Sequence, residues 1–231
     1  MSAVEEPTAI EPQGPPAATG QPEPEFEVLA AAGLERAAAP TLGFRLRIAE
    51  GSGRRVFMVA LSVLIEVEPA KRSYDDAGRE RLVELFGEPE RWATTTQSFR
   101  WAQADLLVSP FTGSTEVELP IACTYDLELA ASKYFDALEG EAPLRFHFNG
   151  TVFYEAEDGR LQLVQIPWDR SVRFAMPIDA WRGAIDAHYP HRAWVPVDRE
   201  TLARLVRLRA ARARPTFDAT ITELLDREEE R

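Results

Sequence analysis

Phe44-Arg-Leu-Arg-Ile-Ala-Glu-Gly-Ser-Gly-Arg-Arg-Val-Phe-Met-Val-Ala-Leu-Ser-Val-Leu-Ile-Glu-Val67 is the stretch that decides the fold class of this chain. Apolar side chains alternate along its first arm and again along a longer second arm, as is typical of half-buried strands. Glu50-Gly-Ser-Gly53 supplies a turn between the two arms. We therefore expect a hairpin whose long second strand, residues 57–67, is heavily buried.

The same period-two pattern continues along the chain and is interrupted by short helices. Asp75 or Asp76 is a suitable N-cap for the first helix, which ends at Gly87. Asp158-Gly159 forms the turn of a second hairpin. A helix is also expected over residues 127–138, and the other expected strands cover residues 99–108, 117–127, 144–154, 161–168 and 172–176.

Helical periodicity dominates the C-terminal part and predicts helices over residues 179–188, 198–212 and 216–228. Thr216 is the expected N-cap of the last helix. Its expected buried face consists of Phe217, Ile221, Leu224 and Leu225. We therefore predict an α+β fold, an antiparallel sheet of six or seven strands with short inserted helices and a helical C-terminal end.

The 231 residues carry a formal charge of −12, and half of it lies in residues 1–40. This segment has seven glutamates against Arg36 alone, and it holds seven of the seventeen prolines. Such a composition buries too little apolar surface to offset the entropy lost on ordering. We expect residues 1–40 to be a disordered acidic Pro/Ala-rich arm and residues 41–231 to form a single domain. Because the overall charge is negative, nucleic acid is not an expected partner.

The cysteine content and the hydropathy pattern limit the compartment and the class of protein. Cys123 is the single cysteine, so the chain cannot form an internal disulfide or a four-cysteine zinc or iron–sulfur site. It lies on an alternating apolar row and is expected to be a small buried hydrophobe. No apolar run reaches the roughly 18 residues of a membrane span, and the first cationic side chain is Arg36. We expect no membrane span, no secretory signal and a cytoplasmic protein.

Motifs that identify an enzyme are missing from the sequence. It has no G-x-S-x-G, no P-loop, no G-x-G-x-x-G after a strand and no H-E-x-x-H. His188, His191 and Asp186 form one ligand-like cluster that could hold a hydrolytic zinc or iron. Pro190 breaks the helix between the two histidines, which disfavours a shared helical face. We therefore assign no catalytic residue, no cofactor and no metal, and we expect a protein that is not an enzyme.

Two segments are candidates for contact with another protein. Phe111, Thr112 and Gly113 belong to the polar segment Ser109–Thr115, which is predicted to be a loop that offers an aromatic side chain. Arg204 and Arg207 belong to a cluster of six arginines within residues 199–214. That cluster is either a solvated helix face or a surface for an acidic partner or for the acidic arm itself.

Seven segments are long and specific enough to compare with known families: Ala39-Pro-Thr-Leu-Gly-Phe-Arg-Leu-Arg-Ile48, Leu85-Phe-Gly-Glu-Pro-Glu-Arg-Trp92, Phe111-Thr-Gly-Ser-Thr-Glu-Val-Glu-Leu-Pro120, Cys123-Thr-Tyr-Asp-Leu-Glu128, Lys133-Tyr-Phe135, Asn149-Gly-Thr-Val-Phe-Tyr154 and Ile166-Pro-Trp168. On these segments the chain resembles a family of actinobacterial and related bacterial proteins that share a domain of unknown function. The resemblance covers about residues 40–225. It implies no activity and assigns no catalytic residue.

The resemblance implies a genomic context, because members of such a family occur beside genes for uptake-type nickel–iron hydrogenases. The leading hypothesis is therefore a non-catalytic accessory or binding protein that contacts a hydrogenase subunit or another accessory factor. One rival is a chaperone-like binder of unfolded segments. The other rival is a metal-binding protein or hydrolase that uses His188 and His191.

Overall fold

The computed structural model describes residues 20–123, 129–190 and 197–231, and the chain divides into two compact units, residues 1–190 (unit 1) and 191–231 (unit 2). The sequence predicts a single domain from residue 41 onward, whereas the structure divides this part of the chain between two compact units. Most of unit 1 is sheet. Its strands are β1 (Glu25–Gly33), β2 (Thr41–Ala49), β3 (Arg55–Val67), β4 (Phe99–Val108), β5 (Phe111–Thr112), β6 (Ser114–Ala122), β7 (Glu141–Glu155), β8 (Leu161–Gln165) and β9 (Ser171–Pro177).

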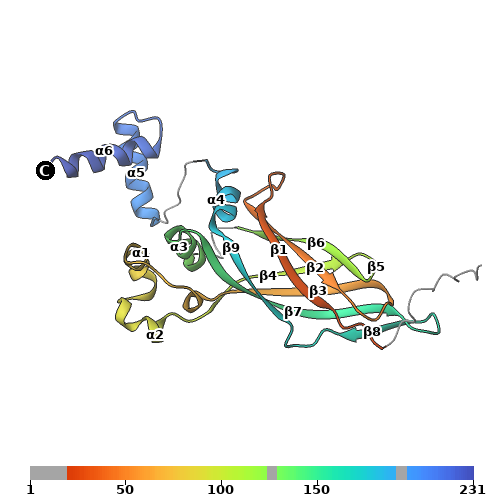
Figure 1. The fold of residues 1–231 in the computed structure, drawn as a ribbon. Coiled ribbons are helices and arrows are strands. Elements are labelled where there is room, and N and C mark those ends of the chain that lie inside the picture. Colours follow the sequence, from red (N-terminus) through yellow and green to blue (C-terminus); the bar gives the residue numbers. More distant parts are fainter. Residues whose placement is uncertain (1–19, 124–128, 191–196) are drawn as a thin grey trace, which may run out of the picture. The chain divides into compact units, whose positions relative to one another are not determined.

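The strands of unit 1 form two antiparallel sheets that face each other (Figure 1). The three-stranded sheet has the order β1-β2-β6. The six-stranded sheet has the order β4-β3-β7-β8, with β5 paired to β3 and β9 paired to β7. The predicted α+β class with antiparallel strands is confirmed.

The predicted hairpin between residues 44–48 and 57–67 is wrong, because its two arms belong to different sheets. β2 pairs with β1 and β6, whereas β3 pairs with β4, β5 and β7. Period-two alternation shows only that a strand buries one of its faces. Two strands from sheets that pack face to face bury one face each, just as two hydrogen-bonded strands of one sheet do, so the pattern does not distinguish the two arrangements. The Glu50 carboxylate organises the crossing, since it accepts hydrogen bonds from the backbone N–H groups of Ser52 (2.9 Å) and Gly113 (3.3 Å).

Residues 25–33, which the sequence analysis placed in a disordered arm, form β1 and pair with β2 over their length. The Phe26 ring stacks on Phe148 of the opposite sheet, with 4.2 Å between ring centroids. Glu25 and Glu27 alternate with apolar residues here, but a run of three alanines at residues 30–32 follows without alternation, so the segment resembles a coil in composition although it is an edge strand. The predicted arm therefore extends too far toward the C-terminus, and its first 19 residues lie outside the described ones.

The core lies between the two sheets and is rich in aromatic side chains. Phe44 of β2 is fully buried and meets Trp101 of β4, Phe146 of β7 and Phe174 of β9 edge-on, with ring centroids 5.1 to 6.2 Å apart. Such edge-to-face arrangements place the positive ring edge over the negative ring face. Cys123 is buried at the end of this core, which confirms its prediction as a small hydrophobe.

β7 is the central strand of the six-stranded sheet, because β3 lies along one edge while β9 and then β8 lie along the other. Its register with β3 continues unbroken through residues 149–151. Gly150 has a φ of +143°, and a Cβ at this position would overlap the Ala60 carbonyl oxygen of β3. Glycine therefore lets the two backbones approach closely at this point.

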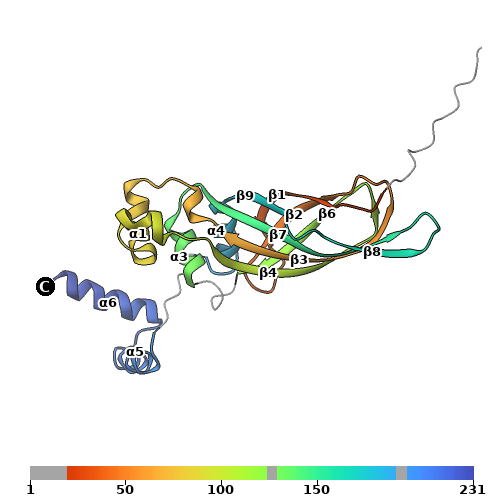
Figure 2. The same cartoon turned by 90° about the horizontal axis from the view of Figure 1, so that it is seen from below.

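The helices of unit 1 gather mainly at one end of the sandwich, away from the β7–β8 turn (Figure 2). Asp75 is the N-cap of the first helix, residues 76–86, since its carboxylate accepts a hydrogen bond from the Gly78 N–H at 2.8 Å, as predicted. The predicted hairpin turn at Gly159, between β7 and β8, is also confirmed. None of the described helices is long and apolar enough to cross a membrane. The helices of unit 1 are α1 (Asp76–Phe86), α2 (Trp92–Thr95), α3 (Leu129–Ala137) and α4 (Ile178–Asp186), with short 3₁₀ turns at Pro69–Lys71 and Pro89–Arg91.

Unit 2 consists of α5 (Arg199–Ala211) and α6 (Phe217–Glu229). Thr216 is the N-cap of α6, as predicted, because its hydroxyl accepts a hydrogen bond from the Ala219 N–H at 3.1 Å. The prediction that α6 buries its apolar face is wrong. Three of the four predicted side chains are exposed, namely Ile221, Leu224 and Leu225.

Candidate interaction surface

The outer face of the six-stranded sheet carries large apolar side chains that nothing in the described structure covers. Leu107, Leu161 and Leu163 are exposed by 70, 62 and 59%. Met58 and Phe153 lie beside them and are partly exposed. We call these five residues the outer patch. Exposed apolar groups scattered singly are ordinary on a protein surface, whereas a contiguous group indicates an interaction site.

The register of four strands assembles the outer patch from distant parts of the sequence. Phe153 of β7 lies between Met58 of β3 and Leu163 of β8, and all three are direct cross-strand neighbours. Leu107 of β4 is opposite Ala60, two residues beyond Met58 on β3. Direct cross-strand neighbours have Cβ atoms about 5 Å apart and diagonal ones about 7 to 8 Å, so Phe153 is next to both Met58 and Leu163, and Leu107 is diagonal to Met58. The patch is therefore one surface.

The outer patch was missed by the sequence analysis, although a signal for it exists. In a half-buried strand every second residue should be polar, yet Met58 and Leu107 are apolar at positions that face outward. Alternation alone cannot tell that such residues from different strands converge, because convergence depends on strand order and register.

A charged cluster occupies the same outer face nearer the helices. The buried Glu68 carboxylate accepts hydrogen bonds from the Nε atoms of Arg145 and Arg173, each at 2.9 Å. Burial raises the pKa of Glu68, but the hydrogen bonds from Arg173 and Arg145 outweigh it and hold the pKa below its ordinary value. Next to them, His147 Nε2 lies 3.0 Å from Glu66 Oε2. The outer face thus has an apolar half and a self-paired charged half.

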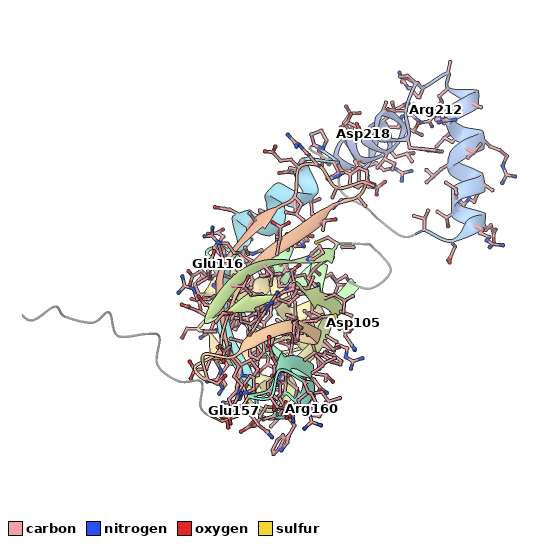
Figure 3. All side chains as sticks on the ribbon, turned by 90° about the vertical axis from the view of Figure 1, so that its right-hand side faces the viewer. Asp105, Glu116, Glu157, Arg160, Arg212 and Asp218 are labelled. Atoms are coloured by element: carbon pink, nitrogen blue, oxygen red, sulfur yellow. The ribbon has the colours of Figure 1, made fainter. Side chains whose placement is uncertain are left out.

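The turn between β7 and β8 is fixed at the far end of the sandwich from the helices. The Arg54 guanidinium bonds Glu157 Oε1 at 2.9 Å and the Gly20 carbonyl oxygen at 2.6 Å, and Arg160 bonds the Asp158 carboxylate at 2.6 Å. Figure 3 shows Glu157 and Arg160 together at this end. These contacts hold β8, which contributes Leu161 and Leu163, in a defined position.

Trp168 follows β8 in the connection to β9 and is 90% exposed, the largest exposed fraction among the apolar side chains of the described residues. Tryptophan is enriched among the residues that dominate binding energy at protein interfaces. Its place in the chain, three residues after the end of β8, adds a second exposed element to the same edge of the sheet.

The structure places the loop candidates differently from the sequence analysis. Phe111 forms the short strand β5 opposite Val56, and its half-buried ring packs against the core. Thr112 is exposed. Gly113 has a φ of +76° and is tied to Glu50, so the segment is a fixed turn between β5 and β6.

The remaining candidates do not come together in one site. Arg204 and Arg207 are exposed on α5 of unit 2. The Nε2 atom of His188 lies 2.9 Å from the Ala37 carbonyl oxygen, so this ring ties α4 to the β1–β2 connection. Asp186 is exposed at the end of α4, and His191 lies outside the described residues. Within the described parts of the chain, no group of three His, Cys, Asp or Glu side chains is placed to hold a metal ion.

A cleft of about 470 Å³ lies beside α1, and the Tyr74 hydroxyl in its lining is hydrogen-bonded within the protein. Tyr74 donates its hydroxyl proton to the Pro69 carbonyl oxygen at 2.8 Å and therefore accepts from Tyr134 at 2.7 Å. Burial raises the pKa of both tyrosines, so both are neutral at physiological pH. The cleft is lined by Arg72, Ser73, Tyr74, Arg79, Pro89, Glu90 and Trp92.

Comparisons with known proteins give a family but no activity. The model of a family described as a family of unknown function (DUF6084) matches residues 21–231. No curated protein matches the chain.

Solved structures give only weak similarity. An ApaA protein from Bordetella pertussis is 13% identical with a TM-score of 0.26, over 68% of this chain and 95% of that one. The β-glucosidase 3B from Thermotoga neapolitana is 14% identical with a TM-score of 0.26, over 67% of this chain and 17% of that one. Spo0M, a sporulation control protein from Bacillus subtilis, is 9% identical with a TM-score of 0.21, over 69% of this chain and 49% of that one.

Proposed function

The chain belongs to the DUF6084 family of unknown function, and we propose that it is a non-catalytic accessory protein that binds another protein through the outer patch. The observation that carries this proposal is the contiguous row Met58, Phe153 and Leu163 with Leu107 beside it, exposed on a rigid sheet. A sheet presents such side chains in fixed positions, so little conformational entropy is lost on binding.

The surroundings of the outer patch favour a protein over a small molecule as its occupant. The patch lies on the outer face of a sheet rather than in a cavity, and small-molecule sites are typically concave. Polar residues border it, including Gln103 and Asp105 on β4 and Gln165 on β8. An apolar centre with a polar rim is the usual anatomy of a protein interface.

We propose a component of nickel–iron hydrogenase assembly or function as the partner, either a hydrogenase subunit or another accessory factor. This part of the proposal is supported by the family resemblance of the sequence and by the genomic context that it implies. The outer patch supports only the mode of contact, which is protein to protein.

The test is co-purification from a native host that expresses the full chain with an affinity tag. We expect hydrogenase components to be retained by the wild type and lost from the double variant Leu107→Glu, Leu163→Glu, because two buried charges would oppose the contact. Gln103→Glu with Gln165→Glu is the matched control, since it adds the same charge on the same strands at outward positions. The control should retain the partner.

Two results would overturn the proposal. Recovery of no hydrogenase component, together with normal hydrogen uptake in a deletion strain, would remove the hydrogenase as partner. Equal retention by the Leu107→Glu, Leu163→Glu variant would remove the outer patch as the surface. Suppression of aggregation of unrelated unfolded proteins by the purified chain would instead assign the patch to chaperone-like binding.

A further inference from the structure

Unit 2 has a defined internal geometry although it contains only two short helices. The Glu223 carboxylate pairs with Arg212, Arg214 and Arg227 at 2.8 to 3.0 Å. Arg212 and Arg214 lie in the turn before α6, so Glu223 fixes that turn to the helix that follows it. The Arg209 guanidinium also lies 4.4 Å from the centre of the Phe217 ring, which joins the end of α5 to the start of α6.

This unit buries very little. Among residues 197–231, Thr220 is the one fully buried side chain. Leu202 and Val206 on α5, and Ile221, Leu224 and Leu225 on α6, are exposed by 37 to 58%. Helices of 13 residues are marginal in water unless an apolar face is packed, so these two stripes require a cover.

The charges on the two helices are opposite. α5 has four arginines, at 199, 204, 207 and 209, against Glu200 alone. α6 has five acidic residues against Arg227 alone. Figure 3 labels Asp218 at the start of α6 and Arg212 just after α5. One unit therefore presents a basic and an acidic helix, each with an exposed apolar stripe.

We propose that unit 2 is a self-association module, in which α5 of one copy packs its apolar stripe against the stripe of α6 of a second copy. A two-fold axis produces this contact twice, and each time it brings a basic helix beside an acidic one. The surface of unit 2 is thus complementary to itself, because an apolar stripe meets an apolar stripe and a basic helix meets an acidic one. The proposal uses residues of unit 2 alone and is independent of the proposed function.

The geometry of each helix identifies which charges border the stripes. Arg199 is three residues before Leu202 and therefore shares its exposed face, whereas Arg204 is two residues from both Leu202 and Val206 and faces elsewhere. On α6, Glu228 is four residues after Leu224, and Glu229 is four residues after Leu225. Arg199, Glu228 and Glu229 should therefore face the second copy.

The test is sedimentation equilibrium of the full chain from about 1 μM to about 1 mM, which covers the affinities of ordinary dimers. We expect a monomer–dimer equilibrium for the wild type. Arg199→Glu, and separately Glu228→Arg, should each raise the dimer dissociation constant about 10-fold, because each variant places like charges together. Arg204→Glu is the control and should leave the dimer unchanged.

Mixing the two charge-reversed variants separates this arrangement from any other cover. The mixed dimer again has opposite charges at both contacts, so equimolar mixing should restore dimers of wild-type affinity. Circular dichroism checks that each variant keeps its helices. A wild type that stays monomeric up to about 1 mM, or a mixture that stays monomeric, would overturn the proposal.

Discussion

The two outer faces of unit 1 satisfy their side chains in different ways. On the three-stranded sheet, Arg47 pairs with Glu27 at 3.2 Å and with Glu116 at 3.3 Å, and Arg45 lies 4.0 Å from Glu116. On the six-stranded sheet, the half nearer the helices pairs its charges around Glu68, but the other half exposes the outer patch. Asp105 and Glu116 are on opposite sides of unit 1 in Figure 3 and mark the two faces.

The difference between the faces separates structural from functional demands on a sheet surface. A ladder of alternating charges is complete within the chain and needs no partner. An uncovered apolar row does not stabilise the isolated chain, and its presence on one face alone is what the proposed contact with another protein would require. The following variants test this distinction, beginning with the largest expected effect.

Gly150→Ala should damage the six-stranded sheet itself. The new Cβ would overlap the Ala60 carbonyl oxygen, and φ at this position lies in the region that favours glycine. We expect the free energy of unfolding to fall by about 3 kcal/mol. Chemical denaturation measures this value. Gly159→Ala is the control, because φ at Gly159 is also positive but a Cβ there would meet no atom. If Gly150→Ala lowers the free energy of unfolding no more than Gly159→Ala does, the close approach of the two backbones is contradicted.

Glu68→Gln should destabilise the charged half of the same face. It removes the carboxylate that pairs with Arg145 and Arg173, and since Arg173 is more than half exposed we expect a loss of about 1 to 2 kcal/mol. The folded-state pKa of Glu68 is lowered from 4.5, so its stabilisation is present above that pH and disappears as the pH falls through the folded-state pKa. Unfolding free energies measured from neutral pH to pH about 3 should therefore converge for wild type and variant. A difference that stays constant over this range would contradict the assignment.

Arg47→Ala should have a small effect that depends on salt. Its two ion pairs are about half exposed, and exposed pairs typically contribute about 0.5 kcal/mol each. Thermal denaturation at low and high ionic strength measures the effect, which should shrink as salt is added. A loss that is independent of salt would show that packing of the arginine stem, rather than charge, stabilises the three-stranded face.

Leu107→Gln should have the smallest effect on stability. The side chain is 70% exposed, so we expect a change within about 0.5 kcal/mol in the free energy of unfolding. The same variant should weaken retention of the partner in co-purification. A loss of stability comparable to that of Glu68→Gln would mean that Leu107 belongs to the structure rather than to an interface.

Local features of the fold could be predicted from the sequence because local chemistry determines them. The caps at Asp75 and Thr216 follow from side chains that accept backbone hydrogen bonds, and the β7–β8 hairpin follows from Asp158-Gly159. The pairing of β2 and β3 could not be predicted, because alternation records burial and not the neighbour. β1 was missed because its central alanines resemble a coil in composition.

The candidate surfaces could be predicted only in part. The arginines of α5 are visible as a cluster in the sequence, and the structure leaves Arg204 and Arg207 exposed. The outer patch depends on register across four strands, which no single segment encodes. The exposure of Ile221 and Leu225 was also unpredictable, because an amphipathic pattern identifies an apolar face without identifying what covers it.

The central place of β7 also sets the order in which the chain can fold. β3 is long and apolar, and its partner β7 follows only after β4, β5, β6 and α3 have been synthesised. Because pairings between distant segments are slow to form, the six-stranded sheet cannot close until residue 155 has left the ribosome. β8 and β9 then add to the free edge of β7 by short connections. A nascent chain that stops before β7 would leave β3 available for aggregation, so truncation there should be more harmful than loss of unit 2.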